Sequence, residues 1–195
     1  MRYYIVFVFL LLSISAFSQT PNEEVNLDDN TAFYEGAENS YIIAPPDGYI
    51  MVTDSAADDG YSFAFIPKGE SYSSASVRIG INIFKIKKDA KDKFKLENLI
   101  NDDTLAYRIH YGETIEIDEV APGVSLTGDS LRTIYFNDTT TFIPNVMMSY
   151  LDGGEEILIF ELSISDSFPR FKAEKIYMEC LGKIKMLEQG SIGIG

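Results

Sequence analysis

The chain has 195 residues, with 30 acidic side chains against 16 basic ones and a formal net charge of −14 at pH 7. A domain this acidic repels phosphate backbones, so no nucleic acid is expected among its partners. It holds one cysteine, Cys180, and one histidine, His110. An intramolecular disulfide is therefore impossible, and so are the Cys/His clusters of a structural zinc site.

The first 18 residues have the pattern of a cleavable signal peptide. Arg2 precedes an apolar run over residues 5–12, and the small residues Ala16 and Ser18 stand at the positions that signal peptidase requires. The apolar run is too short for a membrane-spanning helix, which takes about 20 residues. We therefore expect cleavage before Gln19, a periplasmic or secreted protein, and no membrane span after the signal is removed.

The rest of the chain divides by composition. Residues 19–40 are polar and acidic and show no hydrophobic period, so they are predicted to form a flexible acidic leader. Residues 41–188 are expected to form a single folded domain, which is long enough to bury a proper core. Residues 189–195 are expected to be a tail.

The first half of the predicted folded domain has the pattern of strands that are separated by turns. The expected strands cover residues 41–43, 49–52, 61–66 and 77–83. The last of them alternates apolar and polar residues, which indicates one buried face. Turns are expected at Pro45-Pro46-Asp47-Gly48 and Pro67-Lys68-Gly69, because Pro, Gly and Asp favour turn conformations. An acidic loop is expected over residues 54–60.

The middle of the chain changes period. Leu96, Leu99, Ile100 and Tyr107 fall at helical spacing, which predicts a helix over about residues 93–111. Strands are then expected around residues 115–117, 131–136, 145–151 and 155–165, with a hairpin at Asp152-Gly153-Gly154. The strand over residues 155–165 is apolar on both faces, which predicts a central strand covered on both sides.

A closing helix is expected to begin after Ser167 as its N-cap. Its core stripe would be Ala173, Tyr177, Cys180, Ile184 and Leu187. Cys180 is therefore predicted to be buried and unreactive. The order of elements predicts an α+β fold, an α/β/α sandwich with a central, mainly antiparallel sheet, one helix mid-chain and one C-terminal helix.

This layout resembles the PsbP-like fold family. The matching features are Pro46-x-Gly48-Tyr49, the run Phe65-Ile66-Pro67-Lys68-Gly69-Glu70-Ser71-Tyr72, and the long strand to Ile86. The middle helix, the later hairpin and the closing helix follow in the same order, over roughly residues 41–187. Such proteins often carry Trp where this chain has Tyr49. The resemblance implies a binding or assembly role rather than catalysis, and it provides no catalytic residue.

Few residues suggest chemistry. The sequence contains no GxxxxGK[ST], GxGxxG or GxSxG motif, and no catalytic or cofactor-binding residue is predicted. Asp54, Asp58 and Asp59 offer carboxylate oxygens for a candidate calcium site, although they lack the EF-hand spacing and a solvated acidic turn is the alternative. His110 lies near the predicted end of the first helix, where a cation complements the helix dipole.

Three classes of function remain open. The first is a non-catalytic binding or assembly module that meets a protein partner through its acidic surface. The second is a periplasmic inhibitor or immunity-type protein that occupies a basic partner, with salt-sensitive association. The third is a carboxylate-based hydrolase, although paired carboxylates such as Glu116 and Asp118 occur in any acidic protein and do not by themselves indicate one. It would show a deep cleft and raised carboxylate pKa values.

Overall fold

A computed structural model describes residues 30–36, 38–87, 94–111, 115–138 and 146–188. The predicted signal peptide, most of the predicted leader and the predicted tail lie outside these residues. Within the described ranges, no helix is both long and apolar enough to cross a membrane.

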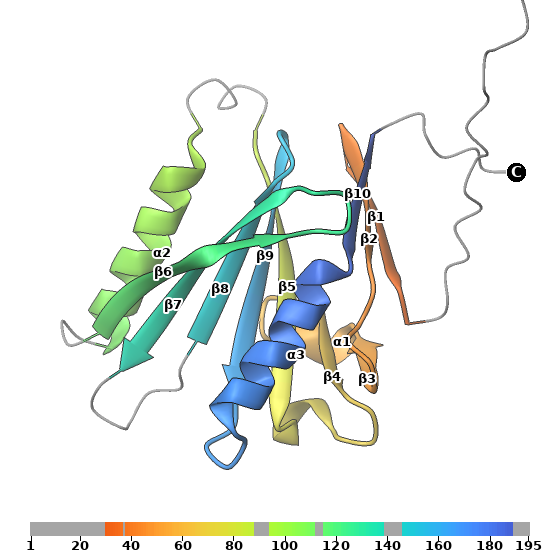
Figure 1. The fold of residues 1–195 in the computed structure, drawn as a ribbon, viewed down its shortest axis with the longest axis vertical. Coiled ribbons are helices and arrows are strands. Elements are labelled where there is room, and N and C mark those ends of the chain that lie inside the picture. Colours follow the sequence, from red (N-terminus) through yellow and green to blue (C-terminus); the bar gives the residue numbers. More distant parts are fainter. Residues whose placement is uncertain (1–29, 37, 88–93, 112–114, 139–145, 189–195) are drawn as a thin grey trace, which may run out of the picture.

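The main structure is a seven-stranded sheet with the order β3-β4-β5-β9-β8-β7-β6, in which every neighbouring pair is antiparallel. Helix α2 covers one face of this sheet and helix α3 lies on the other (Figure 1). The predicted α/β/α sandwich is confirmed. The strands are β3 Tyr49–Val52, β4 Phe63–Pro67, β5 Val77–Lys85, β6 Ile115–Val124, β7 Ser130–Asp138, β8 Val146–Asp152 and β9 Glu156–Ile164, and the helices are α2 Leu96–Tyr111 and α3 Arg170–Gly182.

Strand β9 lies at the centre of the sheet and has two buried faces. Leu158, Phe160 and Leu162 belong to the core under α3. Ile157 and Ile159 belong to the smaller core under α2. The expectation of a central strand covered on both sides is confirmed, because apolar residues at both parities of a strand can be buried only between two layers.

Each helix is anchored by an aromatic side chain. The ring of Tyr107 on α2 stacks on Phe136 of β7 at 4.2 Å between centroids. The hydroxyl of Tyr177 on α3 donates a 2.9 Å hydrogen bond to the backbone carbonyl of Phe160. Cys180 is fully buried one turn further along α3, and burial raises the pKa of its thiol to about 12.

A second, three-stranded sheet corrects two predicted boundaries. It has the order β1-β2-β10, from β1 Ala32–Glu35, β2 Asn39–Ile43 and β10 Ile184–Glu188. The leader predicted over residues 19–40 thus ends earlier, because Ala32 is buried and Tyr34 stacks on Tyr41. The closing helix ends at Gly182, not near Leu187. Ile184 is buried as predicted, but it belongs to strand β10 and lies opposite Ile43 of β2. Its position in the helical stripe was a coincidence of spacing.

Three short segments also differ from the sequence-based expectation or add to it. Residues expected as an acidic loop form helix α1, Asp54–Asp58, because the side chain of Ala56 is buried beneath it. Ser167 is not an N-cap, since α3 begins one residue after Pro169. A single 3-10 turn, η1, covers Tyr72–Ser74.

Candidate functional site

Exposed apolar side chains gather where α3 lies beside β6. Four of the eight large apolar side chains that the described residues leave exposed belong to this region. They are Phe171 and Met178 on α3, Val124 at the end of β6, and Leu126 in the β6–β7 turn. Phe171 and Met178 lie seven residues apart, two helical turns on the same side of α3. Figure 1 shows the β6–β7 hairpin extending past the C-terminal end of α3.

Two observations place Met178 and the C-terminal end of α3 beside the end of β6 and the β6–β7 turn. A side-chain carbon at Gly123 would lie 3.6 Å from the terminal methyl group of Met178. The backbone amide of Leu126 donates to the carbonyl of Ile184, directly after α3, at 2.8 Å. We call this surface the α3–β6 face and define it by Glu116, Asp118, Val124, Leu126, Arg170, Phe171, Glu174, Lys175 and Met178.

Carboxylates border the apolar side chains on the α3–β6 face. Glu116 and Asp118 are exposed on β6 and point to the same side of the sheet, two residues apart. Glu174 lies between Phe171 and Met178 on α3 and accepts a 2.6 Å hydrogen bond from Arg170. The exposed Lys175 lies one turn after Phe171 on the same side of α3, so Arg170 and Lys175 stand against three carboxylates and the face keeps a net charge of −1.

Tyr135 of β7 lies beneath Arg170 on this face. The Arg170 guanidinium is 4.0 Å from the centroid of the Tyr135 ring. The hydroxyl of Tyr135 is buried and has no hydrogen-bond partner among the described residues. Burial raises its pKa, so it remains a neutral hydroxyl. A buried polar group without a hydrogen-bond partner is uncommon in folded proteins, so the Tyr135 hydroxyl is an exception to the usual pairing.

The opposite face of the sheet carries a tyrosine–carboxylate cluster. The Tyr150 hydroxyl donates to Oδ2 of Asp103 at 2.9 Å, and the Tyr61 hydroxyl donates to Glu161. The Tyr61 ring lies over Gly80 of β5, where a side-chain carbon would come within 2.5 Å of the ring. Burial raises the pKa of both the Asp103 and the Glu161 carboxyl groups. Each carboxylate also accepts a hydrogen bond from a tyrosine hydroxyl, which favours the ionised form and offsets part of this rise in pKa.

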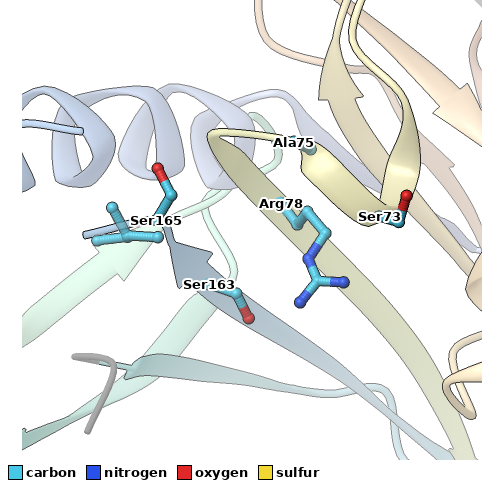
Figure 2. Close-up of a pocket in the computed structure, with 6 residues that line it drawn as sticks. Ser73, Ala75, Arg78, Ser163 and Ser165 are labelled. Carbon is cyan, nitrogen blue, oxygen red and sulfur yellow. The ribbon is translucent and has the colours of Figure 1, made fainter. Parts of the chain in front are cut away.

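A pocket of about 290 Å³ lies at the end of β5 and β9, next to this cluster. Its lining residues are Ser73, Ala75, Arg78, Ser163, Ile164 and Ser165. Figure 2 shows the Arg78 side chain extending from β5 between Ser73 of the η1 turn and Ser163 of β9. Neither Asp103 nor Glu161 lines the pocket, so it does not supply the deep carboxylate cleft of a hydrolase.

The three aspartates of the candidate calcium site lie around α1 but do not form a ligand set. Within the described ranges, no three or more His, Cys, Asp or Glu side chains are grouped so that they could hold a metal ion. Asp59 accepts a 3.0 Å hydrogen bond from Tyr72 and pairs with Arg78 at 3.4 Å. Asp54 accepts a bond from Thr53 at the start of α1, and Asp58 is exposed.

The other residues singled out in the sequence lie as follows. His110 is in the last turn of α2, close to the predicted helix end, and its side chain lies outside the described residues. Sequence reasoning missed the α3–β6 face and the Arg78 pocket. For the α3–β6 face a signal existed: Phe171 and Met178 repeat at a spacing of seven on the side of the helix away from the core stripe. The pocket depends on strand pairing and had no local signal.

No family model matches the chain, and no curated protein matches it. Among solved structures, the chain is similar to the solution structure of a cyanobacterial PsbP from Synechocystis sp. PCC 6803, with a TM-score of 0.45 and 13% sequence identity. The match covers 81% of this chain and 92% of that chain.

Proposed function

We propose that this protein is an exported, non-catalytic binding or assembly module that docks a basic protein segment on its α3–β6 face. The observation that carries the proposal is the exposure of Phe171, Met178, Val124 and Leu126 on two packed elements, with Met178 next to Gly123 and with carboxylates on both elements. Single exposed apolar residues are normal on a protein surface, but several on neighbouring elements with a polar border are typical of an interaction site.

The two parts of the face have different roles. Phe171 is 69% exposed, so covering it removes a large apolar area from water and supplies affinity. Glu116, Asp118 and Glu174 attract Lys and Arg side chains, which sets the choice of partner and the rate of encounter.

A catalytic role fits the described residues less well. Any Ser-His or Cys-His mechanism in this chain would have to use His110 as its base. The single thiol, Cys180, is fully buried with a raised pKa, so it is not an available nucleophile. Asp103 and Glu161 have raised pKa values, as a carboxylate-based hydrolase requires, but each is bound to a tyrosine in the sheet layer.

Export to the periplasm or outside the cell is part of the proposal and depends on the signal-peptide pattern of residues 1–18. An inhibitor or immunity-type protein would use the same kind of face. It is distinguished by its partner, which would be an enzyme or toxin that loses activity in the complex.

The experiment is a pull-down of the tagged full chain from its native envelope at two salt concentrations, with charge-reversal variants. We expect one partner whose recovery falls steeply between about 0.05 and about 0.5 M salt, because screening shortens the reach of exposed charges. Asp118→Lys should abolish recovery. The matched control is Asp102→Lys, which reverses an exposed charge on α2, on the opposite side of the sheet. Equal loss with both variants, or recovery that ignores salt and Asp118, would contradict the proposal.

A further inference from the structure

The Arg78 pocket is built by strand pairing. Arg78 of β5 lies directly opposite Ser163 of β9, so their side chains leave the sheet on the same face. The backbone amide of Ser165 donates to the carbonyl of Ser76 at 3.0 Å, which closes the end of this strand pair. The η1 turn then places Ser73 across from Ser163, with the guanidinium between them (Figure 2).

Arg78 has hydrogen-bonding capacity that the described residues do not use. A guanidinium carries five N–H donors in a planar fork. In the described part of the chain it makes one hydrogen bond, a long one of 3.4 Å to Oδ2 of Asp59, and it lies 5.0 Å from the centroid of the Tyr72 ring. Its side chain is 34% exposed. The remaining donors are thus available to a ligand in the pocket.

We propose that this pocket binds a small hydroxylated carboxylic acid of the sugar-acid type. Arg78 would hold the ligand carboxylate through two parallel N–H···O bonds, the geometry in which guanidinium and carboxylate match best. The hydroxyl groups of Ser73, Ser163 and Ser165 can each donate and accept, as vicinal sugar hydroxyls require. Ala75 and Ile164 supply the apolar contact for the C–H groups of a ring.

The size and charge of the surroundings narrow the ligand class. A volume of about 290 Å³ is at the lower end of small-molecule sites and suits a single ring. Asp59 pairs with Arg78, and Glu161 lies one register step along the same face, opposite Gly80. Two neighbouring carboxylates make the site unfavourable for a dianion such as phosphate, whereas a single carboxylate can share the guanidinium.

The test is a calorimetric titration of the full chain with sodium glucuronate, glucose and inorganic phosphate, each alone. The proposal predicts saturable binding of glucuronate and at least about tenfold weaker binding of glucose, which lacks the carboxylate. Phosphate should bind more weakly than glucuronate. Absence of saturable glucuronate binding, or glucose or phosphate binding equally well, would overturn the proposal.

Substitutions of the lining residues test whether glucuronate binds in the Arg78 pocket. Arg78→Gln should weaken glucuronate binding by about tenfold or more, and Ser163→Ala by a few fold. Glu161→Gln should strengthen it, because a competing negative charge beside the guanidinium is removed. Arg132→Gln is the matched control, since Arg132 pairs with Glu97 and Glu119 away from the pocket. Each variant is first compared with the wild type by circular dichroism. If folded Arg78→Gln and Ser163→Ala bind glucuronate like the wild type, the assignment is wrong.

Discussion

The hydroxyl of Tyr41 donates a 3.2 Å hydrogen bond to Oε1 of Glu156. Tyr41 belongs to β2 of the small sheet and Glu156 begins β9 of the large one, so this bond joins the two sheets. Glu156 is only 2% exposed, which makes it a buried carboxylate that depends on its donors. Gly153 allows the contact, because a side-chain carbon there would overlap the Tyr41 hydroxyl.

Tyr41→Phe should lower the free energy of unfolding by about 1–3 kcal/mol, the usual cost of taking a partner away from a buried polar group. Urea unfolding followed by circular dichroism measures the change. Tyr34→Phe is the control, since Tyr34 contributes its stacked ring to Tyr41 and keeps that ring in the variant. Equal stability of the two variants would show that the Tyr41–Glu156 bond does not stabilise the joint.

Cys180 should resist alkylation in the folded protein and react only on unfolding. Its side chain is fully buried among Tyr177, Leu181 and their neighbours in the core, and its thiol pKa is raised to about 12, so thiolate is scarce at pH 8. Intact-mass measurement of iodoacetamide labelling, with and without urea, tests this. Cys180→Ser should cost about 1–3 kcal/mol of stability through burial of a hydroxyl. Rapid labelling without urea would contradict the helix register.

Glu161 should make stability depend on pH. Burial raises the pKa of its carboxyl in the folded state above the unfolded value, so the folded state binds this proton more tightly. Its cost to stability is therefore fully present above the folded-state pKa and is lost as the pH falls through it.

The stability of the wild type relative to Glu161→Gln should thus increase as the pH is lowered from 8 through the raised folded-state pKa of Glu161, as measured by urea unfolding at several pH values. Glu116→Gln, at an exposed position on β6, serves as the control for general charge effects. A difference between wild type and Glu161→Gln that is constant with pH, or that changes in the opposite direction, would show that burial does not govern Glu161.

Calcium should bind at most weakly at Asp54, Asp58 and Asp59. Asp59 is engaged by Tyr72 and Arg78, and the segment lacks a bidentate Glu at the spacing of a calcium loop. Calorimetric titration of the chain with calcium chloride should give a dissociation constant no tighter than about 1 mM, the weak end of known protein sites. Tight binding that is lost in Asp58→Asn would establish a site here, and tight binding that persists would move it elsewhere.

The large sheet and both main helices could be predicted because their patterns are local. Val77 to Ile83 alternate, the 155–165 segment is apolar on both faces, and Leu96 to Tyr107 follow the helical period. The small sheet could not be predicted in this way. Its outer strands, β1 and β10, are short and lie more than 140 residues apart in the chain, and Ile184 satisfies a helical stripe and a strand equally well.

The candidate sites could not be predicted for the same reason, because each is formed by residues that are far apart in the sequence. The Arg78 pocket needs the register that sets Arg78 opposite Ser163, which no local pattern contains. Net charge pointed to an acidic surface but not to a place on it. That place depends on the packing of the end of α3 beside β6, which brings Met178 next to Gly123.

The most direct test of the docking claim is site-specific photocrosslinking in the native envelope. A benzophenone amino acid replaces Phe171 on the α3–β6 face or, as the matched control, Phe84, which is 42% exposed at the end of β5 on the other side of the sheet. We predict a discrete crosslinked adduct with a basic protein from position 171, none from position 84, and loss of the adduct when Asp118→Lys is added. No adduct from position 171, or the same adduct from both positions, would contradict the assignment of the α3–β6 face as the binding surface.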